Sequence, residues 1–149
     1  MNKNELFMRM ALQEATLASE AGEIPVGAVL TCGDRVIARA HNQTETLQDA
    51  TAHAEMLALT AGMAYMSSKY LPECHLYVSL EPCIMCAGAI GLSQIKQLHY
   101  AAGDEKRGYR QYGVKILHPK TEVFSGLFES ESEALLKTFF KARRKSQGI

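Results

Sequence analysis

Two short stretches of the chain contain residue types that bind metal ions. The first is His53-x-Glu55, and the second is Cys83-x-x-Cys86, which directly follows Pro82. If Pro82 opens a helix, two cysteines three residues apart lie in its first turn, and their sulfurs share one face. The positive end of the helix dipole favours the thiolate, which is the form of cysteine that binds metal. One imidazole and two thiolates form a donor set that suits zinc.

Each stretch has a simpler interpretation when it is taken alone. A histidine near the start of a helix is more often a capping or surface residue than a ligand. Two nearby cysteines are often buried reduced thiols. The motifs support each other because both fall at the start of predicted helices, and Cys83 follows a predicted strand. Such groups converge on one crevice of an open α/β sheet, so we expect His53, Cys83 and Cys86 to bind one zinc ion.

The number of protein ligands decides whether such a site is structural or catalytic. Cys74 lies at the far end of the predicted strand that ends at Leu80. Six residues at ~3.3 Å each place it roughly 20 Å from the other ligands. Cys32 and His41 are not excluded as a fourth ligand, since both can lie near an end of the sheet. A water molecule is the simplest fourth ligand and is typical of a catalytic zinc.

Glu55 is the candidate for moving protons at such a site. It lies two residues after His53, close enough to reach the metal-bound water without binding the metal itself. Zinc-bound water ionises near neutral pH, so it can act as a nucleophile while Glu55 takes its proton and returns protons to the substrate. An acidic residue in the first turn of a helix also interacts with the dipole, which is a frequent surface arrangement. The paired cysteine motif favours the catalytic interpretation.

The composition predicts one globular domain that positions these residues. The chain has 149 residues, of which 47% are hydrophobic and 21% are charged. Sixteen basic residues balance sixteen acidic ones, so net charge neither supports nor excludes a nucleic-acid partner. The sequence contains no internal repeat and no low-complexity linker, and we expect a single domain over residues 1–149.

The same sequence indicates a cytoplasmic protein without membrane association. No apolar run approaches the ~18–20 residues that a membrane span needs. The first residues include Arg9 and Glu14 and lack the uninterrupted apolar segment of a signal peptide. Cytoplasmic thiols stay reduced, and a close cysteine pair there is more often metal-binding or catalytic than a disulfide.

Periodicity and turn residues predict helices that alternate with strands. Helices are expected from a cap at Asn4 to a stop at Gly22, from residue 51 to about 61 with a stop at Gly62, after Pro82, and over residues 130–144. Strands are expected over residues 26–32, 35–40, 75–80, 95–101 and 122–124, and residues 103–113 are expected to form a loop. This order predicts one sheet covered by helices on both faces.

His-x-Glu followed by Pro-Cys-x-x-Cys is the signature of zinc deaminases. The chain resembles the cytidine deaminase-like superfamily over nearly its whole length, and within it the bacterial tRNA-specific adenosine deaminases, in residues 23–29, 51–56, 76–89 and 139–144. The resemblance implies an α/β fold with three layers, α-β-α, and a central mixed sheet of about five strands. It also implies hydrolytic deamination of adenosine to inosine at the wobble position of the tRNA anticodon, one zinc ion per subunit and a homodimer.

The resemblance further suggests substrate-binding residues. Asn42 stands where the family uses an asparagine to hydrogen-bond the flipped nucleoside. Arg143 and Arg144 end the last predicted helix in a basic cluster that can neutralise RNA phosphates, although basic residues there also complement the helix dipole. The chain departs from the family where Gln94 replaces a usual arginine and where residues 109–113 replace a run of small residues. The tyrosines of that segment can stack on RNA bases or pack against the protein.

Two other functions remain open at this point. A free-base deaminase acting on guanine or cytosine would use the same zinc site and the same glutamate. Its pocket would be closed by the carboxyl-terminal segment, whereas the pocket of an enzyme for a tRNA anticodon stem-loop would be open. A small module with a structural zinc would need a fourth protein ligand and would not need Glu55.

Overall fold

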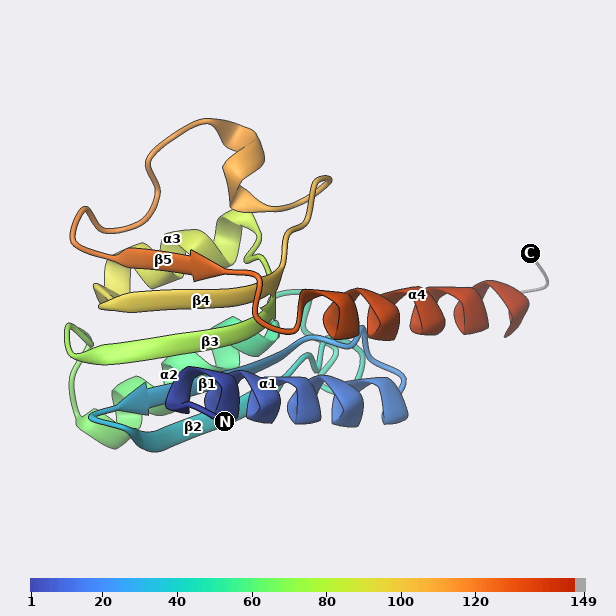
Figure 1. The fold of residues 1–149 in the computed structure, drawn as a ribbon, viewed down its shortest axis with the longest axis horizontal. Helices are drawn as coiled ribbons and strands as arrows, with labels where there is room; N and C mark the ends of the chain where they lie inside the picture. Colours follow the sequence, from blue (N-terminus) through green and yellow to red (C-terminus); the bar gives the residue numbers. More distant parts are fainter. Residues whose placement is uncertain (147–149) are drawn as a thin grey trace.

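In the computed structural model, which describes residues 1–146, helices cover both faces of a five-stranded sheet (Figure 1). The strands follow the order β2-β1-β3-β4-β5 and span Gly27–Cys32 (β1), Arg35–His41 (β2), Cys74–Leu80 (β3), Gln97–Ala102 (β4) and Glu122–Ser125 (β5). Strand β1 pairs antiparallel with β2 and β3, whereas β3 with β4 and β4 with β5 are parallel. The sheet is therefore mixed, and the predicted three-layer α-β-α fold is confirmed.

The helices divide between the two faces of the sheet. Lys3–Glu20 (α1) packs on β1, β2 and β3, and Glu129–Ser146 (α4) packs beside it on β3 and β4. Ala54–Met66 (α2) packs on β1 and β2 and contacts Ile84–Ser93 (α3) on the opposite face. The distal part of α4 projects beyond the sheet (Figure 1). None of the helices in residues 1–146 is long and apolar enough to cross a membrane.

Alternate side chains of the central strands fill two separate core layers. Leu30 and Leu76 belong to the apolar cluster beneath α2 and α3. Val29 and Tyr77 belong to the cluster beneath α1. Because successive residues of a strand point to opposite faces, both faces of the sheet are buried. This double burial fixes the strand ends from which the functional residues extend.

The first helix begins two residues earlier than the sequence predicts. Asn2 is the N-cap, and its side chain accepts a hydrogen bond from the backbone N–H of Glu5. Asn4, predicted as the cap, lies inside α1 and accepts a hydrogen bond from the Tyr77 hydroxyl at 2.7 Å. Both asparagines can cap a helix, and the contact of Asn4 with the sheet decides between them.

The predicted stop of the second helix at Gly62 is also wrong. Helix α2 begins at Ala54 rather than near Thr51, and it continues through Gly62 to Met66. A Cβ atom at residue 62 would lie 2.1 Å from Cδ2 of Leu30. Gly62 therefore allows α2 to pack closely on the sheet, and it does not end the helix.

Residues 103–113 form the expected loop, with one short regular segment. Tyr109–Tyr112 form a 3-10 helix in which Tyr109 is buried. Tyr112 is exposed. Tyr109 therefore packs against the protein, and only Tyr112 remains free to meet a partner.

Candidate active site

The structure brings His53, Cys83 and Cys86 together where β3 leads into α3. Nδ1 of His53 lies 3.6 Å from Sγ of Cys83 and 3.5 Å from Sγ of Cys86. The three donor atoms lie within 4.8 Å of one another, and residues 1–146 contain no other such group of three or more potential ligands. Zinc with bonds of ~2.3 Å to sulfur and ~2.0–2.1 Å to nitrogen holds these atoms about 3.5 Å apart in a tetrahedron. The donor set therefore fits zinc.

Two of these residues occupy equivalent positions at the starts of helices. His53 is the N-cap residue of α2, and Cys83 is the N-cap residue of α3. Both have extended backbone conformations, and neither side chain caps its own helix. Their side chains are therefore free of helix capping and available to a metal ion. Cys86 follows on the first turn of α3, so the two thiols face the same point.

The two thiols differ in their tendency to ionise. Hydrogen bonds from Cys86 and His53 lower the pKa of Cys83 to about 4, although burial opposes them. The neighbouring Cys83 and burial raise the pKa of Cys86. A divalent ion would favour ionisation of both groups.

Glu55 lies beside the ligands and is buried. Glu55 is only 4% exposed, so it is not a surface residue that merely interacts with the dipole of α2, as its position in the first turn would allow. Burial raises the pKa of the Glu55 carboxyl to about 7. A carboxyl group with a pKa near neutrality can both accept and return a proton, which is what general acid–base catalysis requires.

These residues open onto a pocket of about 1490 Å³. His53, Glu55 and Cys83 line it together with side chains from four further segments: the residues before β1, the loop after β2, the loop after β4 and helix α4. Drug-sized ligands occupy pockets of about 300–1,000 Å³, so this volume exceeds the need of a single nucleobase. Charged residues of both signs line it: five are basic (Lys106, Arg107, Lys137, Lys141 and Arg144) and seven are acidic (Glu45, Asp49, Glu55, Glu81, Asp104, Glu105 and Glu133).

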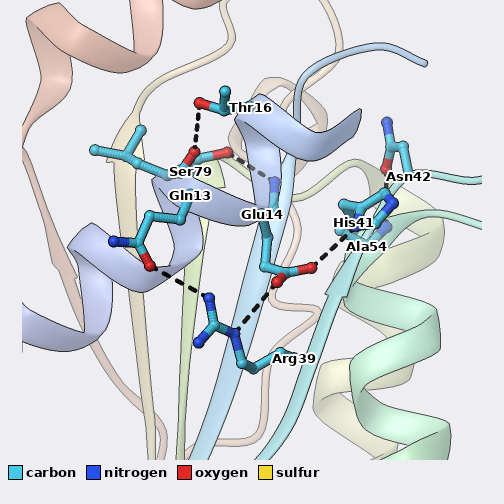
Figure 2. A network of polar contacts seen from close by, with 10 residues as sticks. Gln13, Glu14, Thr16, Arg39, His41, Asn42, Ala54 and Ser79 are labelled. Carbon is cyan, nitrogen blue, oxygen red and sulfur yellow. Dashed lines mark hydrogen bonds and ion pairs between the residues drawn. The ribbon is translucent and has the colours of Figure 1, made fainter. Parts of the chain in front are cut away.

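Asn42 lies on the wall of the pocket and holds the start of α2. Its Oδ1 accepts a hydrogen bond from the backbone N–H of Ala54 at 2.8 Å (Figure 2). The residue before it, His41, bonds Glu14 through Nδ1 at 2.9 Å, and Glu14 also accepts from Arg39 (Figure 2). This network joins α1 to β2, which ends at His41 immediately before Asn42.

The alternative metal ligands that the sequence leaves open are not at the site. His41 bonds Glu14 and is not part of the ligand group. Cys32 is paired in register with Cys74, where β1 ends and β3 begins. Cys74 is thus at the end of β3 opposite to Leu80, as predicted, and the ligand group within residues 1–146 consists of three side chains.

The two arginines at the end of α4 lie differently. Arg144 lines the pocket, on the same side of the helix as Lys137 and Lys141. Arg143 is not among the lining residues, and its guanidinium lies 5.9 Å from the centre of the Phe139 ring. The sequence motif does not distinguish the two arginines. Their successive positions on the helix place Arg144, but not Arg143, on the side that lines the pocket.

Two buried carboxylates hold the walls of the pocket, and the sequence motifs do not reveal their role. Glu23 accepts hydrogen bonds from the backbone N–H groups of Glu45 at 3.1 Å and Thr46 at 2.7 Å. Glu81 accepts from the backbone N–H of Asp104 at 3.0 Å and pairs with Arg110. In the sequence, each of these glutamates is visible only as a charged residue next to an apolar strand. That signal does not identify their hydrogen-bond partners, which lie 22 to 29 residues away in the chain.

Comparisons with known proteins agree with this geometry. Residues 1–102 match the family described as the cytidine and deoxycytidylate deaminase zinc-binding region. The chain is 45% identical over 143 residues to the tRNA-specific adenosine deaminase of Agrobacterium fabrum, covering 93% of this chain and 94% of that protein.

Two solved structures share the fold. One, from a study of A-to-I editing by tRNA A34 deaminases at the wobble position, has a TM-score of 0.82 and 44% identity, and covers 88% of this chain and 99% of that chain. The other, a guanine deaminase from Bacillus subtilis, has a TM-score of 0.68 and 35% identity, and covers 78% of this chain and 73% of that chain.

Proposed function

The chain belongs to the cytidine and deoxycytidylate deaminase family, and we propose that it converts adenosine to inosine at the wobble position of a tRNA anticodon. The observation that carries the proposal is the lining of one pocket by His53 and Glu55 together with five basic side chains. Acidic residues also line the pocket, but Lys137, Lys141 and Arg144 follow one side of α4. A row of cations of this kind suits the phosphates of an RNA loop, whereas a neutral free base does not need it. A purely structural zinc site would not place a buried glutamate beside its ligands.

In this reaction water replaces the amino group at C6 of adenine, and ammonia leaves. His53, Cys83 and Cys86 would hold zinc, which supplies a Lewis acid that lowers the pKa of a water molecule to near neutrality. Glu55 accepts a proton from the attacking water and delivers it to the ring nitrogen. It then takes the second proton, from the new C6 hydroxyl group, and delivers it to the amino group, which leaves as ammonia while the C6 carbonyl forms. Its pKa of about 7 lets the same carboxyl act as base and as acid.

Asn42 is proposed to orient the nucleoside. Its Oδ1 is bonded to the backbone N–H of Ala54, so the side chain has a fixed direction on the pocket wall. The amide nitrogen of the same side chain is a donor and can bond an acceptor of the base or the ribose. This contact would fix the position of the substrate relative to Ala54, which lies between His53 and Glu55.

RNA phosphates are proposed to bind along α4 and the loop after β4. Lys137, Lys141 and Arg144 are spaced by four and three residues and line the pocket from one side of the helix. Arg143, the other arginine that the sequence suggests, lies over Phe139, so the geometry favours Arg144 as the phosphate ligand. A tRNA substrate also agrees with a cytoplasmic location.

We also infer a homodimer. Several large apolar side chains are exposed on α3 and on the segment that follows the 3-10 helix, among them Leu92, which is 79% exposed, with Ile84 and Val114. Exposed apolar surface of this kind marks an interface, and a two-fold pair of identical surfaces is the commonest solution. Measurement of the molar mass in solution tests this inference.

The substrate is tested by direct incubation. The zinc-loaded protein is incubated with an anticodon stem-loop that has a wobble adenosine, with the same stem-loop that has a wobble guanosine, and separately with guanine and cytosine. We expect inosine from the first RNA only. Ammonia from guanine or cytosine, without inosine from the RNA, would refute the tRNA assignment in favour of a free-base deaminase.

A further inference from the structure

Glu81 connects the loop after β4 to the metal-binding segment of the chain. Its side chain is 1% exposed and lies just after β3, two residues before Cys83. The loop supplies two of the basic residues of the pocket, Lys106 and Arg107. The position of these cations therefore depends on how the loop is held.

The carboxylate of Glu81 binds both ends of the segment that contains these cations. Oε1 accepts hydrogen bonds from the backbone N–H of Asp104 at 3.0 Å and from Nη2 of Arg110 at 2.9 Å. Oε2 accepts from the backbone N–H of Arg110 at 3.1 Å. A buried carboxylate is costly unless it is hydrogen-bonded, and these three bonds all come from residues 104 and 110.

The loop backbone lies directly against this carboxylate. A Cβ atom at Gly108 would lie 2.2 Å from the carboxyl group of Glu81. The next residue, Tyr109, donates its backbone N–H to the carbonyl of Pro82 at 2.9 Å. Gly108 also forms an antiparallel bridge with Cys83. The loop is thus held against residues 81–83 at several adjacent points.

Arg110 neutralises the charge of Glu81 and is itself held in place. Its guanidinium lies 5.4 Å from the centre of the Tyr100 ring on β4, so it contacts both β4 and the residue that follows β3. The arginine lies in the segment where the sequence departs from the small residues usual in related enzymes. The Glu81–Arg110 ion pair thus joins the segment that contains the zinc motif to a segment outside it.

We propose that Glu81 and Arg110 are positioning residues that hold segment 104–110 so that Lys106 and Arg107 bind phosphates beside the reacting nucleotide. This proposal rests on the proposed RNA substrate. Neither residue of the ion pair touches the reacting atoms. Their loss weakens substrate binding through Lys106 and Arg107, while the zinc ligands and Glu55 remain in place.

The test compares Arg110→Ala with Lys115→Ala, which removes one positive charge from the same loop but outside the pocket lining. KM and kcat for the wobble-adenosine stem-loop are measured at several salt concentrations. Arg110→Ala is expected to raise KM about tenfold and to change kcat less than about threefold. It is also expected to reduce the magnitude of the slope of log(kcat/KM) against log[salt] by about two, one for each of Lys106 and Arg107. Lys115→Ala stays within about twofold of wild type, and Arg110→Lys restores most of the lost affinity.

A second comparison separates positioning from direct contact of Arg110 with RNA. Glu81→Gln keeps the charge of Arg110 but removes the ion pair, so it raises KM as Arg110→Ala does. Adding Arg110→Ala to the Lys106→Ala/Arg107→Ala variant has little further effect, because the residues that it positions are already absent. Zinc content and Tm are measured for every variant, so that loss of metal or of folding is distinguished from loss of affinity.

Three results would overturn the proposal. Arg110→Ala can behave like Lys115→Ala, its effect can add fully to that of Lys106→Ala/Arg107→Ala, or Glu81→Gln can leave KM unchanged. In each case wild-type protein still produces inosine, and only the positioning role fails. Wild-type protein that produces no inosine from the stem-loop refutes the proposed function, and the positioning role with it.

Discussion

Oδ1 of Asn42 accepts a hydrogen bond at 2.8 Å from the backbone N–H of Ala54. Ala54 lies between the metal-binding candidate His53 and the proton carrier Glu55, so one side chain on the pocket wall fixes the backbone of both. The same amide group is proposed to bind the nucleoside. The position of the substrate and the position of the catalytic carboxyl therefore depend on one residue.

Asn42→Asp and Asn42→Ala separate these two roles. Aspartate keeps an oxygen for the Ala54 N–H but lacks the amide donor, so we expect normal zinc content and Tm with a kcat/KM reduced about 10–100-fold. Alanine also leaves the Ala54 N–H without its partner, which costs about 1–2 kcal/mol of stability. Thermal unfolding and inosine formation measure the two effects. Full activity of Asn42→Asp would exclude the proposed nucleoside contact.

Glu55→Gln removes the proton carrier without removing a metal ligand. We expect a zinc content near one per subunit and a decrease in kcat of about 10²–10⁴-fold, because glutamine cannot accept or return a proton. Metal analysis and inosine formation are measured on the same preparation. Retention of wild-type turnover would rule out the role assigned to Glu55.

Cys83→Ser and Cys86→Ser should each lose zinc together with stability near the site, since binding of a structural or catalytic metal is coupled to folding. Chelation of the wild-type metal should lower Tm in the same direction. Cys32→Ser is the matched control, because Cys32 lies beside Cys74 at the end of β3 opposite the site. Zinc content that fell as far in the control as in the ligand variants would contradict the assignment.

His99 should make the stability of the fold depend on pH. Its ring is stacked between Tyr77, at 4.3 Å, and Phe124, at 4.9 Å, and burial lowers its pKa from 6.5 to about 4. The unfolded chain therefore binds a proton as the pH falls through 6.5, whereas the folded chain does not until about pH 4. The free energy of unfolding therefore decreases by an amount on the order of 3 kcal/mol as the pH falls from 6.5 to about 4.

The measurement is urea unfolding at a series of pH values, with His99→Phe as the comparison. Phenylalanine keeps the stacking between the flanking rings and has no proton to bind. The difference in free energy of unfolding between the two proteins should therefore change over the interval from pH 6.5 to 4. A parallel pH dependence of both proteins would show that His99 is not responsible.

Arg144→Ala and Arg143→Ala test which side of α4 binds RNA. We expect Arg144→Ala to raise KM about 5–10-fold and to lower the salt dependence of kcat/KM, because Arg144 lines the pocket. Arg143→Ala removes the same charge from the next position and should have a smaller effect, since its guanidinium lies over Phe139. Equal effects of the two substitutions would indicate phosphate contacts outside the pocket.

The metal-binding candidates could be predicted from sequence because their spacing is local. His53 and Cys83 are each the N-cap residue of a helix. Pro82, predicted to open the helix, lies just before the N-cap Cys83, and the helix itself begins at Ile84. The stop assigned to Gly62 failed because the glycine accommodates Leu30 of a distant strand. Local patterns show where a helix can begin or end, but contacts with other elements decide between the possibilities.

The residues that shape the pocket could not be predicted in the same way. Glu23 and Glu81 lie within segments that resemble the family, but their roles depend on which loops fold back onto them. Arg143 and Arg144 are equivalent in a basic cluster until the rotation of α4 is known. These features come from tertiary packing, to which a single sequence gives no direct access.

The two buried carboxylates also affect how such a protein can change over evolutionary time. Glu23 holds one wall of the pocket and Glu81 holds another, while neither belongs to the ligand group. Substitutions and insertions in either loop can therefore reshape the pocket while the zinc donor set stays intact. The loops held by Glu23 and Glu81 can therefore vary separately from the three metal-binding candidates, although both contribute to the same pocket.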